Sequence, residues 1–285
     1  MDNGRDTVSA EGEVTSVPEI IGFIGAGQMG EPMVRRLLGA GHDVVLYARR
    51  DEVRERLAEA GARLADSVAD VAARSDILIV CLFSDAQLAD LAGGPDGFMS
   101  NARAGSVVVS HTTGNVSTLE KLGAEYPDGP ALIDAPVSGA ATDIEAGRLT
   151  VLLGGDEAAV ERAEPVLAAY ADPILRTGGP GSALNLKLVN NMLFAANAQL
   201  VAAAVELGER LGVGGEQLLS AVAVSSGRSH ALASVQLLGD VGTFTKVASP
   251  FLRKDVAACV VAAEDAGVDL GWLRSVVDAG PIELS

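Results

Sequence analysis

Short apolar runs alternate with segments of helical periodicity between residues 18 and 180. Runs rich in Val, Ile and Leu are typical of buried strands, and the amphipathic segments between them are typical of covering helices. This alternation predicts an α/β domain with a doubly wound, parallel sheet. The expected strands are residues 20–24, 43–48, 77–82, 106–110, 131–134, 149–153 and 174–177, and the expected helices are residues 51–60, 117–126 and 157–170.

The pattern changes after the break Gly178-Gly179-Pro180-Gly181. Apolar and small residues with helical spacing continue without interruption to about residue 211, and further alanine- and leucine-rich helical segments follow. A helix of about 30 residues spans about 45 Å, so we expect it to join two domains and to contribute to a homodimer or homotetramer interface. The expected boundaries are 1–17 for a polar, disordered leader, 18–180 for the α/β domain and 181–285 for an all-helical domain.

A Gly-x-Gly-x-x-Gly turn follows the first expected strand and precedes a helix. In this context the first glycine permits the tight turn, the second lets the backbone approach a pyrophosphate, and the third permits close packing of helix and strand. The helix N-terminus adds free amides and a partial positive charge. The pattern predicts a Rossmann-type dinucleotide cradle formed by Gly25, Ala26, Gly27, Gln28, Met29 and Gly30.

The end of the second strand carries Ala48, where an NAD site usually places an acid that binds the ribose hydroxyls. Arg49 and Arg50 follow, and two guanidinium groups can bind a 2′-phosphate through charge-assisted, bidentate hydrogen bonds. The sequence therefore favours NADP(H), with NAD(H) as the alternative cofactor. Asp51 is an alternative ribose ligand, but we expect it to cap a helix that begins at Glu52.

The composition limits the classes of function. The 285 residues are 48% hydrophobic and carry a net charge of −17 without a basic tract, which indicates sizeable cores and argues against nucleic acid as a partner. Cys81 and Cys259 both lie in apolar segments, which favours a reducing, cytoplasmic location over a disulfide framework. The apolar segment 188–207 contains several Asn and Gln residues, so we expect a buried helix and no membrane span.

Lys187 is one of four lysines and lies in the long helix, four residues before Asn191. Residues at this spacing share a helix face, so the two side chains can reach the same ligand. A buried ammonium group is costly unless it is paired or faces a polar cleft. From the pattern alone, an ion pair that stabilises the fold and an active-site lysine are equally well supported.

Four motifs follow one another along the chain. They are the cradle of residues 22–33 with its methionines, the segment Asp-Ala-Pro-Val-Ser-Gly-Ala of residues 134–140, the set Gly181, Lys187 and Asn191, and the pair Lys254-Asp255. Together they resemble the signatures of the β-hydroxyacid dehydrogenases, the family of 3-hydroxyisobutyrate dehydrogenase and tartronate semialdehyde reductase. The resemblance extends from residue 19 to about residue 270.

The resemblance implies a reversible, NAD(P)-dependent oxidation of a 3-hydroxy acid to its semialdehyde or keto acid. It implies that Lys187 is the general acid and base, with a pKa lowered by burial, and that Asn191 orients the substrate or the lysine. Ser138 and the backbone amides of Gly139 and Ala140 would hold the substrate carboxylate. Contacts to the cofactor are implied for Leu82, Thr113 and Lys254.

Some residues depart from the family pattern. Ala140 stands where a second glycine is commoner, Phe83 where a proline is expected, and Ser110-His111 where an acidic and an apolar residue are usual. These departures concern substrate identity more than reaction class. His111 and His230 are alternative substrate contacts, although a loop histidine is more often solvated or hydrogen-bonded locally, and neither has companions that suggest a metal site.

Two other functions stay open at this point. An imine reductase would share the fold, but Lys187 stands where such enzymes typically carry another proton donor. A catalytically silent NADPH-binding protein is the second alternative, and the joint presence of Lys187, Asn191 and Ser138 argues against it.

Overall fold

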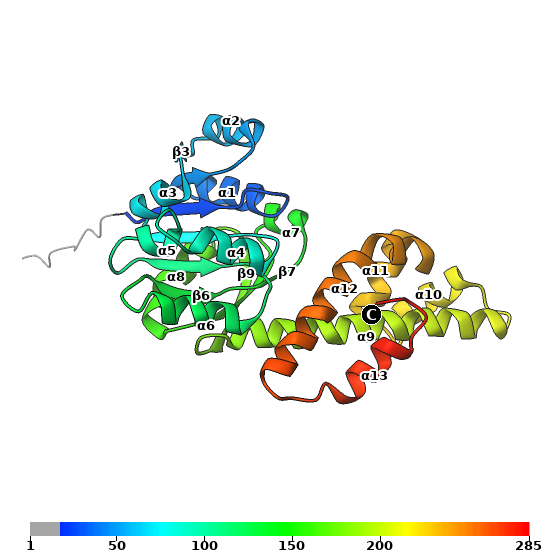
Figure 1. The fold of residues 1–285 in the computed structure, drawn as a ribbon. Helices are drawn as coiled ribbons and strands as arrows, with labels where there is room; N and C mark the ends of the chain where they lie inside the picture. The colour runs from blue at the N-terminus through cyan, green and yellow to red at the C-terminus, as the bar shows by residue number, and fades with distance from the viewer. Residues whose placement is uncertain (1–17, 285) are drawn as a thin grey trace, which may run out of the picture.

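The computed structural model describes residues 18–284, so the expected leader of residues 1–17 lies outside the described residues. An α/β part and a helical part are joined by one long helix, α9 (Ser182–Arg210) (Figure 1). Each expected strand and helix is present, with differences of up to three residues at the ends. The strands are β1 (Ile20–Ile24), β2 (Asp43–Tyr47), β3 (Arg63–Leu64), β4 (Ile77–Val80), β5 (Val107–Ser110), β6 (Ala131–Asp134), β7 (Val137–Ser138), β8 (Leu149–Gly154) and β9 (Ala171–Gly178).

The helices of the α/β part connect successive strands. One sequence expectation about them was wrong: α2 begins at Asp51 with Arg50 at the N-cap position, so Asp51 lies in the first turn and does not cap a helix that starts at Glu52. A carboxylate in the first turn still interacts favourably with the helix dipole. The helices of this part are α1 (Gly30–Gly39), α2 (Asp51–Glu59), α3 (Val68–Arg74), α4 (Asp85–Ala92), α5 (Phe98–Asn101), α6 (Val116–Glu125), α7 (Ala141–Glu145) and α8 (Glu157–Leu167).

The strand order is β3-β2-β1-β4-β5-β6-β8-β7, with β9 paired to β8. The first six strands of this order, β3-β2-β1-β4-β5-β6, are parallel and form the doubly wound arrangement of a dinucleotide-binding sheet. The expectation of a wholly parallel sheet was wrong at one edge, because β8 runs antiparallel to β6 and β7. Only the five-residue helix α7 separates β7 from β8, and parallel pairing needs a longer crossover.

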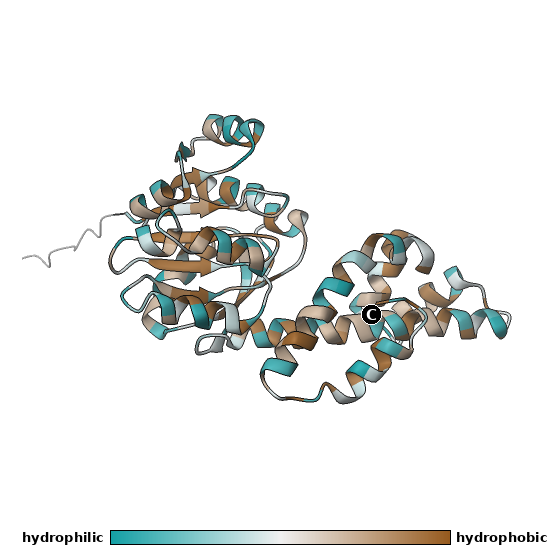
Figure 2. Cartoon of the chain, viewed as in Figure 1, coloured by the Kyte–Doolittle hydropathy of each residue, from teal (hydrophilic) through white to brown (hydrophobic). Residues whose placement is uncertain are grey.

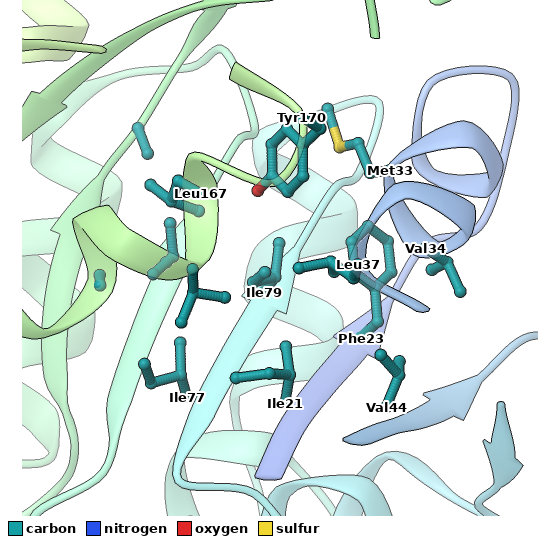
Figure 3. Close-up of a cluster of buried hydrophobic side chains, with 14 of the residues drawn as sticks. Ile21, Phe23, Met33, Val34, Leu37, Val44, Ile77, Ile79, Leu167 and Tyr170 are labelled. Carbon is teal, nitrogen blue, oxygen red and sulfur yellow. The ribbon is translucent and has the colours of Figure 1, made fainter. Parts of the chain in front are cut away.

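The sheet of the α/β part has a hydrophobic core on each of its faces, and the first of these cores lies against α1 and α8. Fully buried side chains of three strands pack against α1 and against the end of α8 (Figure 3). Figure 2 shows the same distribution, with hydrophobic residues along the strands. Burial on this scale is the main stabilising contribution of the domain. The residues that Figure 3 labels are Ile21, Phe23, Met33, Val34, Leu37, Val44, Ile77, Ile79, Leu167 and Tyr170.

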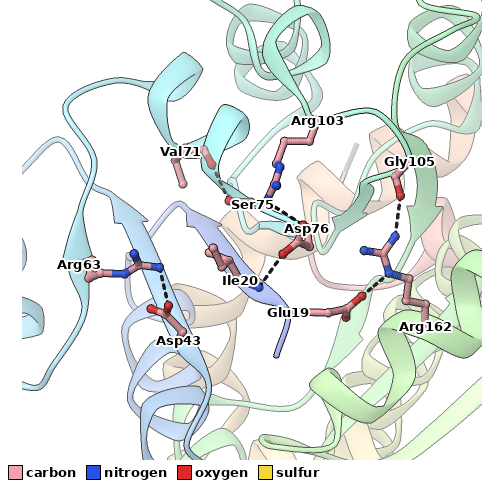
Figure 4. A network of polar contacts seen from close by, with 10 residues as sticks. All are labelled: Glu19, Ile20, Asp43, Arg63, Val71, Ser75, Asp76, Arg103, Gly105 and Arg162. Atoms are coloured by element: carbon pink, nitrogen blue, oxygen red, sulfur yellow. Dashed lines mark hydrogen bonds and ion pairs between the residues drawn. The ribbon is translucent and has the colours of Figure 1, made fainter. Parts of the chain in front are cut away.

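Polar contacts tie together the amino ends of the parallel strands (Figure 4). The Asp76 carboxylate accepts a hydrogen bond from the Ile20 amide at 2.9 Å and another from Arg103 at 2.9 Å. Nearby, Arg162 pairs with Glu19. Ligands of such sheets bind at the opposite, carboxyl ends of the strands, so these contacts stabilise the fold.

The helical part is built around α9, which packs against α11 (His230–Leu238), α12 (Val241–Asp265) and α13 (Gly271–Ala279), with α10 (Gly215–Ala223) near its end. By length and composition, α9 could cross a membrane, and it is the one helix among the described residues of which this is true. Half of its most apolar window is buried in the protein. The buried Gln199 on α9 donates to the carbonyls of Val277 and Ile282 at 2.8 and 2.6 Å. Its own carbonyl accepts from the Ile282 amide at 2.8 Å, which ties the last described residues to the long helix.

Candidate active site

The glycine turn has the geometry that a dinucleotide cradle requires. Gly25 has φ +97°, and a Cβ there would lie 2.1 Å from the carbonyl oxygen of Cys81. A Cβ on Gly30 would lie 2.2 Å from the carbonyl oxygen of Gly25, so the first turn of α1 packs directly on the loop. Gly27 has no neighbour within 4 Å of such a Cβ, which leaves room for a pyrophosphate. The residues present therefore fit the dinucleotide.

The two arginines after β2 are exposed and differ in their surroundings. Arg50 lines a cavity of about 650 Å³ together with Gly27 and Gln28 of the cradle, whereas Arg49 is not among the lining residues. Arg50 is 3.9 Å from Glu52, a distance typical of a weak surface ion pair. Sequence reasoning missed Arg35, which lines the same cavity from α1 and pairs with Glu31 at 3.0 Å.

Lys187 is partly buried in the first turns of α9. Among residues 18–284, no hydrogen bond and no ion pair within 4.0 Å involves its ammonium group. Burial lowers the pKa of Lys187, and the Asp255 carboxylate on α12 opposes that effect. The sequence pattern left open an ion pair that stabilises the fold and an active-site lysine. The structure provides no such ion pair for Lys187 among the described residues.

Asn191 lies one turn further along α9 and is buried, with 7% of its surface exposed. Its side-chain carbonyl accepts a hydrogen bond from the Asn190 amide group at 3.3 Å. The spacing of four residues places Asn191 on the same helix face as Lys187.

Lys254 connects the helical part to the carboxyl edge of the sheet. Its ammonium group donates to the Phe83 carbonyl at 2.7 Å and lies 4.5 Å from the centre of the Phe83 ring. Phe83 follows Leu82, whose amide donates to the Thr112 hydroxyl at 3.4 Å. Leu82, Thr112 and the adjacent Thr113 therefore lie at the ends of the neighbouring strands β4 and β5.

The expected substrate segment is exposed at β7 and the loop after it. Gly139 has φ +136°, and a Cβ there would lie 3.0 Å from the Asp143 carboxylate, so a glycine suits this position. The Ala140 amide already donates to the same carboxylate at 2.8 Å. This contact removes Ala140 from the expected set of carboxylate donors and leaves the Ser138 hydroxyl and the Gly139 amide.

His111 is a buried residue with hydrogen bonds on both ring nitrogens, so the expectation of local hydrogen bonding is confirmed and the alternative of a substrate contact is wrong. Its Nδ1 is 2.5 Å from the Ala135 carbonyl oxygen, and its Nε2 is 2.7 Å from the Tyr170 hydroxyl. The carbonyl can only accept, so Nδ1 carries the proton and Nε2 accepts from the hydroxyl. Burial lowers the pKa of His111 to about 4, although the bond to Ala135 opposes this. His230, in contrast, is exposed at the start of α11.

Asp134, the first residue of the 134–140 motif, has a buried carboxylate that contacts the start of α9. Asp134, at the end of β6, has 1% of its surface exposed and accepts hydrogen bonds from the amides of Gly181 and Leu184 at 2.8 and 2.9 Å. An acid directly after a buried strand is the sequence signal, because a buried carboxylate must find donors.

The doubly wound sheet and its glycine cradle define a dinucleotide-binding protein. Residues 20–179 match the family model described as the NAD-binding domain of 6-phosphogluconate dehydrogenase, and residues 181–279 match that described as NAD-binding of NADP-dependent 3-hydroxyisobutyrate dehydrogenase. The chain belongs to the β-hydroxyacid dehydrogenase family and is an NAD(P)-dependent oxidoreductase of hydroxy acids.

Individual relatives agree with this assignment. The chain is 33% identical over 253 residues to a 2-(hydroxymethyl)glutarate dehydrogenase of Eubacterium barkeri, covering 88% of this chain and 84% of the relative. It is 34% identical to the mitochondrial 3-hydroxyisobutyrate dehydrogenase of Rattus norvegicus, over 73% of this chain and 62% of the relative. The structure of a Mycobacterium tuberculosis 3-hydroxyisobutyrate dehydrogenase with L-serine superposes with a TM-score of 0.81, at 26% identity and 92% coverage of each chain. An imine reductase of a Pseudomonas species, at 20% identity and a TM-score of 0.60 with 92% coverage of each chain, shares the fold.

Proposed function

We propose that this protein reversibly oxidises a small 3-hydroxy acid to its semialdehyde or keto acid, with NADP(H) as the preferred cofactor and Lys187 as the general acid and base. The observation that carries the proposal is the state of Lys187. Its ammonium group is partly buried and has a lowered pKa, and no described residue pairs with it. A lysine without a pairing carboxylate is available to a ligand, and a lowered pKa makes it a better proton donor.

The bound nicotinamide would supply the site that accepts or returns a hydride. In the oxidation, Lys187 in its neutral form would take the proton from the substrate hydroxyl. In the reverse direction, its ammonium form would give that proton to the carbonyl oxygen and stabilise the developing negative charge. Asp255 opposes the effect of burial on the pKa of Lys187, so the ammonium form stays accessible. Asn191, one turn away, would orient the substrate oxygen or the lysine.

The cofactor preference rests on the end of β2. Ala48 is buried and carries no carboxylate that would repel a 2′-phosphate. Arg50 lines the same cavity as Gly27 and Gln28. From there its guanidinium group would reach the 2′-phosphate of a cofactor bound at the cradle. Arg49 would contribute charge from the adjacent exposed position. We propose NAD(H) as the poorer cofactor.

The substrate class rests on a carboxylate anchor. The Ser138 hydroxyl and the Gly139 amide are exposed at β7, and they would hold a substrate carboxylate at a fixed distance from Lys187. Two relatives named above are dehydrogenases of 2-(hydroxymethyl)glutarate and 3-hydroxyisobutyrate. Both compounds are 3-hydroxy acids, and we propose this class for the substrate.

A homodimer is the assembly that the exposed face of α9 supports. Leu186, Leu193, Leu200 and Leu207 repeat at intervals of seven residues, and each is about half exposed. A seven-residue repeat of leucines forms a continuous apolar stripe along one helix face, the pattern of a helix that packs against another. Sedimentation should give a dimer or tetramer, and Leu193→Glu should shift it toward the monomer. A monomeric wild type would contradict the assembly.

A cytoplasmic location stays a prediction from the cysteine pattern.

The test is a turnover assay that follows reduced nicotinamide. Wild type, Lys187→Ala and the control Lys246→Ala, an exposed lysine on α12, are given 3-hydroxyisobutyrate or 2-(hydroxymethyl)glutarate with NADP⁺ or NAD⁺. Loss of a general acid and base lowers kcat by about 10²- to 10⁴-fold. We expect this loss in Lys187→Ala, with an unchanged NADPH Kd, and normal kcat in the control. Turnover of Lys187→Ala at the wild-type rate would remove Lys187 from the mechanism. A parallel assay gives wild type cyclic imines with NADPH, and turnover there without turnover of either hydroxy acid would replace the substrate class.

A further inference from the structure

The N-terminus of α9 is held by one buried carboxylate from the other domain. Asp134 ends β6, and its Oδ1 accepts from the Gly181 amide while its Oδ2 accepts from the Leu184 amide. Both carboxylate oxygens are therefore bonded to the first turn of the helix, where the dipole favours a negative charge. Lys187 follows Leu184 by three residues, which is less than one helical turn.

Two further strands contact the same helix terminus. The Thr177 hydroxyl on β9 lies 2.8 Å from the Ser182 hydroxyl. A Cβ on Gly154, at the end of β8, would lie 2.7 Å from the Ser182 hydroxyl oxygen and 2.9 Å from Asp134 Oδ1. The backbone of β8 thus packs directly against the helix terminus. The position of α9 relative to the sheet is therefore fixed by direct contacts with the ends of β6, β8 and β9.

Asp134 is also the first residue of the expected substrate segment. Asp134 is followed by Ala135, Pro136 and Val137, all at least partly buried, and Ser138 comes next. The Ala135 carbonyl is fixed from behind by the His111 imidazole. One short, rigid stretch of chain therefore separates the carboxylate that holds α9 from the proposed carboxylate anchor.

We propose that Asp134 is a positioning residue that couples the two halves of the substrate site. It holds the helix that carries Lys187 at a fixed distance from the loop that carries Ser138, and this inference rests on the function proposed for those residues. A hydroxy acid of the right length can then place its carboxylate at Ser138 and its hydroxyl group at Lys187 at the same time. Proton transfer depends steeply on such placement, since a displacement of about 1 Å costs up to about 100-fold in rate.

The variant Asp134→Asn keeps the size of the side chain and changes only the hydrogen bonds that hold α9. An asparagine offers one acceptor oxygen, so one of the two buried amides would face an NH₂ donor. Asp156→Asn is the matched control, because Asp156 caps α8 in the same domain through the Ala158 amide at 3.1 Å. Asparagine caps a helix as well as aspartate does, so the control keeps its capping bond.

The experiment has two readouts. The first compares kcat, KM for the hydroxy acid and the NADPH Kd, with the enzyme concentration set by NADPH binding so that only folded protein counts. The second is NMR of lysine labelled with ¹³C at Cε, which follows four signals, with that of Lys187 assigned from its loss in Lys187→Ala. It reports the titration of Lys187 without turnover.

For Asp134→Asn we expect a kcat lower by roughly 10- to 100-fold, a raised KM for the hydroxy acid, an unchanged NADPH Kd and a shifted Lys187 titration. The control should match wild type in all four. A folded Asp134→Asn with wild-type kcat, KM and Lys187 titration overturns the inference, even if its Tm is lower. If Asp134→Asn does not fold, Asp134→Glu decides, since it keeps both carboxylate oxygens but lengthens by one methylene the side chain that holds the Gly181 and Leu184 amides: a reduced kcat with a shifted Lys187 titration supports the inference, and wild-type values overturn it.

The two proposals fail separately. If Lys187→Ala turns over normally, the proposed function fails, while the NMR titration still shows whether Asp134 places Lys187. If Lys187→Ala is inactive and Asp134→Asn is normal in both readouts, only the positioning role fails.

Discussion

The buried His111 makes a specific prediction about stability in acid. Its ring is enclosed by the Ala135 carbonyl and the Tyr170 hydroxyl, and burial lowers its pKa from 6.5 to about 4. In the folded protein the imidazole stays neutral down to about pH 4, whereas in the unfolded chain it is protonated below about pH 6.5. Between these two values the unfolded state binds the additional proton, so the free energy of unfolding falls as the pH falls.

The size of the effect follows from the two pKa values. Each factor of ten in proton affinity is worth 1.36 kcal/mol, so the full difference between 6.5 and about 4 corresponds to about 3 kcal/mol. The contribution is intact above pH 6.5, is reduced by about 2 kcal/mol at pH 5, and is lost near pH 4. A loss of this size is a large fraction of the stability of a typical domain.

Urea unfolding at pH 7 and pH 5 measures it. We compare wild type with His111→Gln, which cannot titrate, because the acidic residues affect both proteins alike and cancel in the difference. Wild type should lose about 2 kcal/mol more than His111→Gln between the two pH values. His230→Gln controls for replacing a histidine at an exposed position. An equal loss in wild type and His111→Gln would refute the view that a neutral, buried imidazole holds the Ala135 carbonyl.

Three further predictions concern the site. Asp255→Asn removes the charge that opposes the effect of burial on Lys187, so the pKa of Lys187 should fall further and the rise of kcat/KM with pH in the oxidation should move to lower pH; an unmoved or upward-moved profile would contradict this. Arg50→Ala should raise KM for NADP⁺ by about 10-fold or more while KM for NAD⁺ stays the same, and equal effects on both would remove the 2′-phosphate contact. Gly30→Ala would place a Cβ 2.2 Å from the Gly25 carbonyl, so calorimetry should show loss of NADPH binding, and wild-type affinity would contradict the account of the cradle.

The sequence was most informative where one local pattern determines the structure. The strand at residues 20–24 was expected with the bounds of β1, because a short apolar run before a glycine turn has few alternatives. The two-residue strands β3 and β7 were missed, since they are too short for any periodicity. The antiparallel edge was missed because strand direction depends on the connection between β7 and β8 and leaves no trace in the apolar runs.

The sequence names candidate residues for the site, but it does not contain their contacts. The spacing of Lys187 and Asn191 placed them on one helix face, but only the packing of α12 brings Asp255 near enough to oppose the effect of burial on the lysine. The Ala140 amide is bonded to the carboxylate of Asp143, three residues later, a capping contact that needs the start of α7, and no helix was expected there from the sequence. The role of Asp134 depends on a helix that begins 48 residues further along the chain, at Ser182, a partner that no window of sequence contains.

Chemical rescue of Lys187→Ala by primary amines tests whether the Lys187 side chain is the acid and base. Hydroxy acid oxidation by this variant is measured at saturating NADP⁺ with small alkylamines of increasing basicity. We expect the lost rate to return with amine concentration and the rescued rate to follow the basicity of the amine, as when a base takes the hydroxyl proton in the rate-limiting step. Full turnover without any amine, or a rescued rate independent of amine basicity, would contradict the assignment of Lys187 as the acid and base.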